Sequence, residues 1–350
     1  MGVKPIDPLV VADAFFPRDR WFSPQPLTSG HIHATYRMER RSGQVYLLQR
    51  INQRVFPDLE AMAYNLGQMH RFLPESADGL RFPRLFPDVA GQLLHMASDG
   101  TVWRMQEYIS DTYTPKVCLD ADMALAAGRS VGLFLRKLDQ VLPNPLRETI
   151  PGFHDVFGRW QKLREVATRA DQQRLARSKN LWRALEKDWE YLRPLLPKGQ
   201  HGLPLRPVHN DPKLGNMLFS RKTGKLVAII DWDTIMPGIV LTDYGDLVRS
   251  ICATAPEDEP EWSRIRFRQD YLSALSQGFQ ESTRDILSPK ERDLLPVGPA
   301  WIIFEQSVRF LTDFLAADVY YPVRYAHHNI VRAENQQVLL HAYLDRHPIG

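Results

Sequence analysis

Pro207-Val-His209-Asn-Asp211-Pro-Lys213-Leu-Gly-Asn216-Met-Leu-Phe219, followed by Leu226-Val-Ala-Ile-Ile-Asp231-Trp-Asp233, is the most informative stretch of this 350-residue sequence. An acid is followed five residues later by an amide, and a second acid ends an apolar run. Phosphoryl transfer from a nucleotide needs a group that orients or deprotonates the attacking hydroxyl, and oxygen ligands for Mg²⁺. The pattern predicts Asp211 in the first role and Asn216 with Asp231 in the second. Taken alone, Asp211 would be read as an acid that caps a turn.

The segments around these acids have the pattern of a hairpin. Two apolar runs, 217–219 and 226–230, flank the turn Arg221-Lys-Thr-Gly224. Pairing of the two strands would bring Asn216 and Asp231 together, as a cation that bridges phosphates requires. His209 could act as a proton carrier, but we expect it instead to orient the loop by a hydrogen bond to the backbone near Asp231. Lys213 is placed either to reach the transferred γ-phosphate or to remain a solvated lysine.

Composition bounds the class of protein. A net charge of +3, with 44% hydrophobic and 24% charged residues, is ordinary for a globular enzyme and calls for no nucleic-acid, membrane or protein partner. Cys118 and Cys252 lack the spacing of a metal site, so we expect free thiols in a reducing compartment. The chain shows no apolar leader or membrane-length run, and a cytoplasmic location is expected.

The periodicity changes along the chain. Short β-rich runs at 36–38, 44–51 and 101–108 surround a helix expected at 59–73, behind Asp58. Helical patterns then dominate, at 124–138, 159–195, 262–279, 295–317 and 335–344. We predict an α+β, bilobal protein-kinase-like fold, with an antiparallel N-terminal lobe over 1–107, a larger helical lobe over 108–350 and a hinge at about 104–110. A nucleotide would lie between the lobes, with adenine bonded to backbone groups of Glu107 and Ile109.

The motif resembles a known superfamily. His209 to Asn216, with Ile230 to Asp233, is similar to the motif of the aminoglycoside phosphotransferase and choline kinase superfamily. Four further segments, 30–36, 46–58, 233–249 and 309–332, resemble the N-acetylhexosamine 1-kinases. That resemblance implies ATP- and Mg²⁺-dependent phosphorylation of the anomeric C1 hydroxyl of N-acetylglucosamine or N-acetylgalactosamine. It implies substrate contacts at His31, Arg309 and Tyr320, with Asp246 and Arg249 as secondary candidates, and an acceptor-side loop at 152–155 with Arg159.

The third strand departs from the general kinase pattern. Gln49 shares one face with Val45 and Leu47, and it occupies the position where a lysine usually meets the phosphates. The N-acetylhexosamine 1-kinases resemble this chain in having glutamine there, so we place Gln49 at the nucleotide. Because glutamine carries no charge, the group that neutralises the phosphates is left open. Ser29-Gly30-His31 has one glycine, which is too little for a dedicated phosphate cradle.

Residues of the C-terminal half bear on the acceptor. Glu305, Arg309 and Asp313 recur every four residues, so they share one helix face. They form either an exposed ion-pair ladder or a set in which acids hold Arg309 in the cleft, and the resemblance favours the second. Tyr320 could stack on a sugar ring. His33, two residues beyond His31, is expected to be a surface histidine.

Two other functions stay open at this point. A kinase for a cationic or amino-acid acceptor, such as an aminoglycoside, choline or homoserine, would want an acid-lined pocket, and Glu305 and Asp313 could supply part of one. An inactive nucleotide-binding module is the alternative from another class. The intact set of Asp211, Asn216 and Asp231 argues against it.

Overall fold

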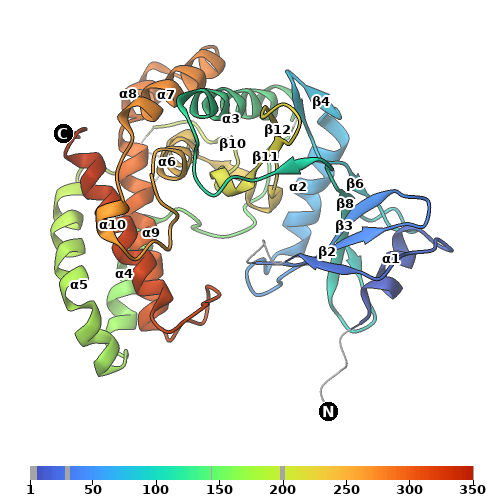
Figure 1. The fold of residues 1–350 in the computed structure, drawn as a ribbon, viewed down its shortest axis with the longest axis horizontal. Helices are drawn as coiled ribbons and strands as arrows, with labels where there is room; N and C mark the ends of the chain where they lie inside the picture. Colours follow the sequence, from blue (N-terminus) through green and yellow to red (C-terminus); the bar gives the residue numbers. More distant parts are fainter. Residues whose placement is uncertain (1–5, 28–31, 143, 198–201, 350) are drawn as a thin grey trace.

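The computed structural model describes residues 6–27, 32–142, 144–197 and 202–349. A sheet-containing N-terminal part lies beside a mostly helical C-terminal part, drawn in blue and in green to red respectively (Figure 1). The front sheet is antiparallel throughout. The predicted α+β, kinase-like fold class is therefore confirmed.

The front sheet has the strand order β1-β2-β3-β8-β6, with β7 also paired to β8. The three longest strands agree with the β-rich runs of the sequence. Their hydrophobic face packs on helix α1, and this small core contains Val11, Met38, Leu48 and Met105. The strands are β1 Gln25–Leu27, β2 Ala34–Glu39, β3 Val45–Arg50, β6 Leu85–Phe86, β7 His95–Met96 and β8 Val102–Glu107, and α1 is Pro8–Phe15.

Helix α2, Leu59–Phe72, begins where the sequence predicted. The Asp58 side chain accepts a hydrogen bond from the backbone N–H of Ala61 at 2.8 Å. Such an N-cap typically contributes about 1 kcal/mol to stability. The buried face of the helix, which includes Met62 and Leu66, packs into the large core of the molecule.

A second sheet combines strands from both halves of the sequence. Its order is β4-β5-β12-β11-β9, and Arg81 of β5 pairs in parallel with Ala228 of β12. Residues 76–81 therefore share a sheet with the 217–229 hairpin. The exact division into lobes at residue 107 stays a prediction. The strands are β4 Ser76–Ala77, β5 Leu80–Arg81, β9 Thr112–Tyr113, β11 Met217–Ser220 and β12 Leu226–Ile229.

The helical part agrees with the predicted pattern except at two boundaries. The charged helical region expected at 159–195 holds two helices, because the chain turns before the N-cap Asp171. The expected start at residue 262 is wrong: only a 3₁₀ turn lies there, and the α-helix begins at Gln269. The last helix begins at His328 rather than near 335. The helices are α3 Ala121–Val141, α4 Val156–Ala167, α5 Gln172–Leu192, α6 Val240–Ile251, α7 Gln269–Thr283, α8 Pro289–Leu294, α9 Val297–Leu315 and α10 His328–Leu344, with 3₁₀ turns at η1 Leu214–Asn216, η2 Trp232–Thr234 and η3 Trp262–Arg264.

Helices α6 and α9 approach closely through two glycines. A Cβ on Gly245 would lie 2.3 Å from the carbonyl oxygen of Gly298, and one on Gly298 would lie 2.3 Å from the carbonyl oxygen of Leu241. Both distances are below van der Waals contact, so a side chain at either position would force the helices apart. Four aromatic residues of α9 are buried: Trp301, Phe304, Phe310 and Phe314.

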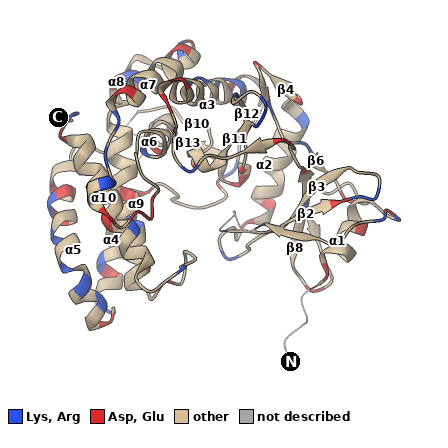
Figure 2. Ribbon diagram, in the orientation of Figure 1, with Lys and Arg blue, Asp and Glu red and all other residues tan. Residues whose placement is uncertain are grey.

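Charged residues are spread over the outer helices, with both signs along α5 (Figure 2). Cys118 and Cys252 are buried free thiols, as expected. Within the part of the chain that the structure describes, no helix combines the length and apolar character needed to cross a bilayer.

Candidate active site

The loop that carries Asp211 is held between two short paired strands. Strand β10, Arg206–Val208, precedes the loop and pairs with β13, Met236–Gly238. From α6, the buried carboxylate of Asp243 accepts hydrogen bonds from the backbone N–H groups of His209, at 2.7 Å, and Asn210, at 2.6 Å. Burial raises the pKa of Asp243 to about 7, although both of these hydrogen bonds oppose the change. Asp243 thus anchors the loop from beneath.

His209 behaves as the sequence predicted. Its Nε2 lies 3.0 Å from the carbonyl oxygen of Ile230, the residue before Asp231. Its Nδ1 accepts a hydrogen bond from the backbone N–H of Asp211 at 3.3 Å. The ring therefore links the 209–211 loop to the end of β12.

The Asp211 side chain has two partners within its own loop. Lys213 Nζ lies 3.0 and 2.7 Å from its carboxylate oxygens, and Asn216 Nδ2 donates to Oδ2 at 2.8 Å. Burial alone would raise the pKa of Asp211, but the charge and hydrogen bonds of Lys213 lower it overall. Burial likewise opposes the charge of Lys213, and the Asp211 carboxylate more than compensates, so the pKa of Lys213 is raised. Asp211 is thus ionised at neutral pH.

The hairpin brings Asn216 and Asp231 together as predicted. Met217 of β11 pairs with Ile229 of β12, and the next N–H, from Ile230, donates to the Asn216 carbonyl at 2.9 Å. Asn216 uses its amide nitrogen on Asp211, so its side-chain oxygen is directed elsewhere.

Asp231 stands in an unusual conformation. Its φ of 70° lies in the left-handed region, which for a non-glycine residue costs about 1–3 kcal/mol. Burial, followed by the nearby charges of Asp233 and Asp211, raises its pKa to about 6. No hydrogen bond or ion pair from another described residue engages the carboxylate. A strained, unpaired acid of this kind is poised to receive a cation.

Asp233, two residues further on, is fully paired. The two terminal guanidinium nitrogens of Arg104, Nη1 and Nη2, contact its two oxygens, with Nη2 at 2.8 Å from Oδ2. His33 Nε2 lies 2.7 Å from Oδ2. Burial would raise the pKa of Asp233, but the charge of Arg104 and the contact with His33 hold it well below its usual range. The expectation that His33 is a surface residue is wrong, because its side chain is almost completely buried against Asp233 and Phe56.

Gln49 belongs to the same network. Its Oε1 accepts from Arg104 Nε at 2.9 Å and from Gln106 Nε2 at 3.0 Å, and its Nε2 donates to Thr35 at 3.1 Å. The cation nearest to this third-strand position is therefore Arg104, on the neighbouring strand β8. Its guanidinium is already used by Asp233 and Gln49, so the role of Gln49 at the nucleotide stays a prediction.

The hinge residues have partly occupied backbones. The N–H of Glu107 donates to the Arg84 carbonyl at 2.8 Å, and the carbonyl of Ile109 accepts from Thr112 at 2.7 Å. Among the described residues, no hydrogen bond uses the N–H of Ile109. The expected bonding of adenine to the backbones of Glu107 and Ile109 stays a prediction.

The three charged residues of α9 do not form a ladder. Glu305 is buried and contacts His154 Nδ1 at 3.0 Å and Trp301 Nε1 at 3.2 Å. Asp313 accepts from the backbone N–H groups of Tyr320 and Tyr321 at 2.8 and 2.9 Å. Both acids are therefore used within the fold, and Asp313 does not hold Arg309.

Arg309 is buried but poorly paired. Its nearest carboxylate oxygen, on Glu305, is 4.0 Å away, and its side chain is 9% exposed. The guanidinium lies 5.1 Å from the ring centre of Phe153 and 5.8 Å from that of Tyr321. Burial opposes its charge, yet Tyr321, Glu305, Tyr320 and Asp211 keep its pKa raised. Arg309 is thus close enough to Asp211 for the carboxylate charge to contribute to its raised pKa.

The secondary candidates form a separate network. Arg249 Nε donates to Asp246 Oδ1 at 2.8 Å, and its Nη1 donates to Glu257 at 2.8 Å. Both Asp246 and Arg249 are buried.

Tyr320, which the resemblance places at the substrate, is exposed and packs edge-on against Tyr321, with ring centres 4.7 Å apart. His31 lies outside the described residues.

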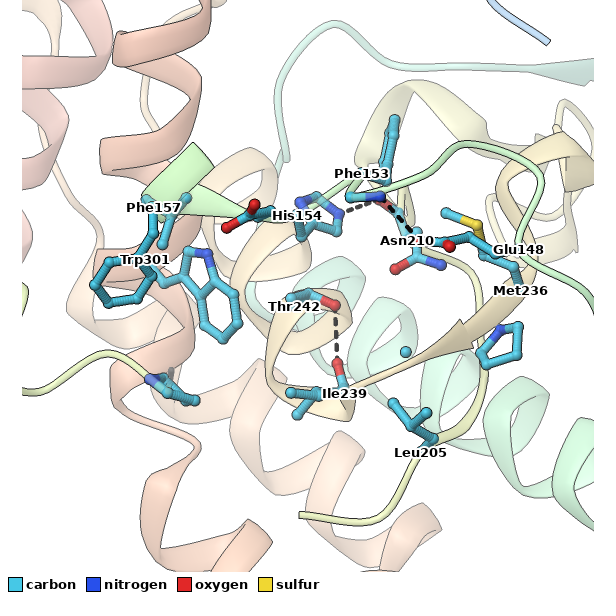
Figure 3. Close-up of a pocket in the computed structure, with 16 residues that line it drawn as sticks. Glu148, Phe153, His154, Phe157, Leu205, Asn210, Met236, Ile239, Thr242 and Trp301 are labelled. Atoms are coloured by element: carbon cyan, nitrogen blue, oxygen red, sulfur yellow. Dashed lines mark hydrogen bonds between the residues drawn. The ribbon is translucent and has the colours of Figure 1, made fainter. Parts of the chain in front are cut away.

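Sequence reasoning missed two residues that support the site. Arg104 reaches Asp233 from 129 positions away, and His154 contacts the Asn210 carbonyl at 2.8 Å (Figure 3). Only the absence of a lysine at position 49 hinted that another cation was needed. Nothing in the sequence alone indicated His154 beyond its place in the acceptor-side loop.

Comparison with known families agrees with this geometry. The model of the family described as "phosphotransferase enzyme family" matches residues 23–284. This range is more than half of the chain and includes Asp211, Asn216 and Asp231. The chain belongs to this family. This phosphotransferase is also similar to solved structures along almost its whole length.

An aminoglycoside phosphotransferase from Alicyclobacillus acidocaldarius superposes with a TM-score of 0.64 and 14% identity, covering 99% of this chain and 97% of that one. A microcompartment-associated aminopropanol kinase superposes with a TM-score of 0.65 and 17% identity, covering 96% of this chain and 98% of that one. A spectinomycin phosphotransferase in complex with ADP and spectinomycin superposes with a TM-score of 0.60 and 14% identity, covering 96% of this chain and 94% of that one. At these identities the likeness shows a common fold, and the acceptor of this phosphotransferase must be argued from its own residues.

Proposed function

We propose that this phosphotransferase is an ATP-dependent kinase that phosphorylates the anomeric C1 hydroxyl of an N-acetylhexosamine, N-acetylglucosamine or N-acetylgalactosamine. The observation that carries the choice lies on the acceptor side of Asp211, where the Arg309 guanidinium is beside the rings of Phe153 and Tyr321 and makes no hydrogen bond to another residue that the structure describes. Guanidinium donors and aromatic faces suit a neutral, oxygen-rich ring. The sequence resemblance to the N-acetylhexosamine 1-kinases supports the same choice.

The rival reading, a kinase for a cationic acceptor, fits these residues less well. It required Glu305 and Asp313 as pocket acids, and both are engaged by groups of the fold. The charge offered to the acceptor would instead be that of Arg309, which disfavours an aminoglycoside or choline by like-charge repulsion.

In the proposed reaction Asp211 orients the acceptor hydroxyl and takes its proton. The C1 oxygen forms a bond to the γ-phosphorus as the bond from that phosphorus to the β–γ bridging oxygen breaks, and ADP leaves. The lowered pKa of Asp211 makes it a weak base. Proton transfer therefore comes late, when the forming O–P bond has made the hydroxyl acidic.

Asn216 and Asp231 would hold Mg²⁺ through the amide oxygen and the unpaired carboxylate. Mg²⁺ commonly takes one or two protein oxygens and completes its shell with phosphates and water, so this small ligand set fits. The ion would neutralise charge on the phosphates of ATP. Lys213 lies beside Asp211, within reach of the transferred group, and the backbones of Glu107 and Ile109 with Gln49 would line the nucleotide site.

The remaining predicted contacts are part of the proposal to different degrees. Tyr320 is exposed next to Tyr321 and is free to cover a sugar, and His31 stays a candidate from the resemblance. Asp246 and Arg249 bond each other, so we assign them an indirect role behind Lys213. The two free thiols agree with a reducing compartment such as the cytoplasm.

The test is a coupled ADP-release assay with Mg²⁺ and ATP across three acceptor sets: N-acetylhexosamines, aminoglycosides, and amino alcohols with homoserine. We expect turnover with the first set, and ³¹P NMR of the product should show a phosphate ester coupled to an anomeric proton. Turnover only with a cationic acceptor, or a phosphate on another hydroxyl, would overturn the assignment. Stabilisation by Mg²⁺–ATP without any turnover would point to the inactive module.

A further inference from the structure

His154 occupies a buried position between helix α9 and the loop that carries Asp211. Its Nε2 lies 2.8 Å from the carbonyl oxygen of Asn210, and its Nδ1 lies 3.0 Å from Oε1 of Glu305. Figure 3 shows the ring directed at Asn210 from the chain segment before α4. His154 is also one of the residues that line a cavity of about 260 Å³.

Both partners of this ring are hydrogen-bond acceptors. A backbone carbonyl oxygen only accepts, and so does a carboxylate. Burial raises the pKa of Glu305, but the groups around it lower it overall. Besides His154 itself, the charges of Arg309 and Arg159 favour the ionised carboxylate, and Trp301 Nε1 donates to its other oxygen, so we take Glu305 as ionised on grounds that do not depend on His154. Both ring nitrogens of His154 must therefore carry hydrogen, and the ring is an imidazolium.

Two other buried histidines provide an internal contrast. His33 Nδ1 accepts from the backbone N–H of Asn52 at 3.0 Å, and His209 Nδ1 accepts from that of Asp211. Each of those rings must keep a lone pair on Nδ1, so each has its proton on Nε2 alone. The charged state of His154 therefore follows from its own partners and not from burial in general.

We infer that the His154 imidazolium is a positioning residue for phosphoryl transfer, which fixes the peptide between Asn210 and Asp211 by a hydrogen bond that only the charged ring can make together with its bond to Glu305. This role rests on the proposed role of Asp211. A peptide unit is planar, so holding the Asn210 carbonyl also sets the direction of the Asp211 N–H.

The other backbone groups at this point are already held. Asp243 accepts from the N–H groups of His209 and Asn210, and Thr234 Oγ1 donates to the His209 carbonyl at 2.8 Å. Asn210 itself has a φ of 64°, in the left-handed region, so the loop needs restraint to keep its shape. His154 supplies the restraint on the remaining carbonyl.

The surrounding charges determine when the ring loses its proton. Burial lowers the pKa of His154, but the Glu305 carboxylate and the Asn210 carbonyl raise it above its ordinary value, against the opposing charge of Arg309. Arg159 on α4 and Asp243 on α6 also face this cluster. A raised pKa means that the stabilisation is complete below the ordinary value of about 6.5 and is lost as pH rises through the raised value.

The first experiment reads the ring directly. We expect ¹⁵N-resolved NMR of the imidazole groups in the full chain at pH 7 to show both nitrogens of His154 protonated, with His33 and His209 as neutral references in the same spectrum. Resonances are assigned by the loss of one set in His154→Gln. A neutral His154 in the folded protein would overturn the inference, and this readout needs no substrate.

The second experiment links the proton to turnover. Glu305→Gln removes the charge that favours the imidazolium, so we expect the basic limb of the kcat–pH profile to move to lower pH. His154→Gln keeps a donor for only one of the two acceptors, so we expect kcat to fall by roughly 10–100-fold with KM for ATP nearly unchanged, because misplacement of a reacting group by about 1 Å has effects of this size.

A matched control is available on the outer helices. His341 on α10 contacts Asp188 on α5 at 2.8 Å, and this contact raises its pKa as well. His341→Gln should leave the pH profile of kcat unchanged. A Glu305→Gln profile that coincides with that of the parent would refute the positioning role. An imidazolium in a protein that phosphorylates none of the tested acceptors would instead count against the proposed function alone.

Discussion

Asp231 and Asp233 are separated by one residue, yet their surroundings are opposite. Asp233 is buried and bonded to Arg104 and His33, and its pKa is strongly lowered by these partners. Asp231 has no such partner among the described residues, adopts a left-handed backbone, and has a pKa raised to about 6 by burial and neighbouring acids. One acid is satisfied by the fold and the other is held ready for a ligand.

The contrast separates structural charge from charge kept for chemistry. A buried acid with a bidentate arginine stabilises a particular arrangement of the elements that carry the pair, here strand β8 and the segment after β12. A half-buried acid without a partner, such as Asp231, destabilises the fold until a cation arrives. Asp211 combines features of both acids. It is paired with Lys213 and Asn216, as Asp233 is paired with Arg104, but its side chain stays partly exposed and can meet a ligand.

The largest expected effect tests the ligand-facing group. Asp211→Asn removes the proton acceptor while keeping the shape of the side chain, so we predict a loss of kcat of about 10²–10⁴-fold, the range typical of a general base. Binding of Mg²⁺–ATP, measured by calorimetry, should persist. Asp293→Asn, an exposed acid on α8, is the control and should keep full activity. An Asp211→Asn variant as active as the parent would remove the basis of the proposed chemistry.

The same chemical change at two neighbouring positions tests the comparison itself. Asp233→Asn leaves Arg104 buried without its counter-charge, and breaking a buried pair in this way costs about 3–5 kcal/mol of unfolding free energy. Asp231→Asn breaks no pair among the described residues and removes a half-buried charge, so its unfolding free energy should equal or exceed that of the parent. Urea unfolding without Mg²⁺ measures both. Equal destabilisation by the two substitutions would show that the two acids are not different in kind.

A smaller effect is expected at His33. His33→Phe keeps a ring over Phe56 but loses the contacts to Asp233 and to the Asn52 N–H. We predict a loss of about 1–2 kcal/mol, because Arg104 still pairs with Asp233 and the main loss is one unsatisfied donor. His70→Phe, at an exposed position of α2, is the control. A loss as large as that of Asp233→Asn would make His33, and not Arg104, the main partner of Asp233.

The sequence predicted the ligand-facing residues and not their supports, for a reason of distance along the chain. Asp211 and Asn216 are five residues apart, and a hairpin of local apolar pattern brings in Asp231, so short-range signals were sufficient. The pairs Arg104–Asp233 and His154–Glu305 join positions 129 and 151 residues apart. No periodicity relates residues so distant, and only the packed fold brings them together.

The predicted start of a helix was wrong where a tertiary contact overrides the local sequence pattern. Residues 262–268 read as helix, but a bridge between Ala253 and Phe267 holds the segment extended, and the α-helix starts only at Gln269. His33 was misread for a similar reason, since a polar residue in a loop looks exposed until Asp233 is known to lie beside it. Local composition cannot report a partner 200 residues away.

The last expected effect is spread over several pH units and concerns Asp243, which is paired within the fold like Asp233 but titrates near neutral pH. Its folded-state pKa of about 7 is above the unfolded value of about 4, so between these values the native state binds the extra proton. The unfolding free energy therefore falls as pH rises towards 7, by at most about 1.4 kcal/mol per pH unit from this group, and is unaffected by it at higher pH.

Turnover should show the opposite trend. A protonated Asp243 is a poorer acceptor for the two backbone N–H groups of His209 and Asn210, so the Asp211 loop is less restrained below pH 7 and kcat should fall. Asp243→Asn cannot titrate, so the difference between its stability–pH curve and that of the parent isolates this group. If the two stability–pH curves had the same slope from pH 5 to 7, Asp243 would be ionised throughout this range. It would then resemble Asp233, whose charge is compensated by partners within the fold.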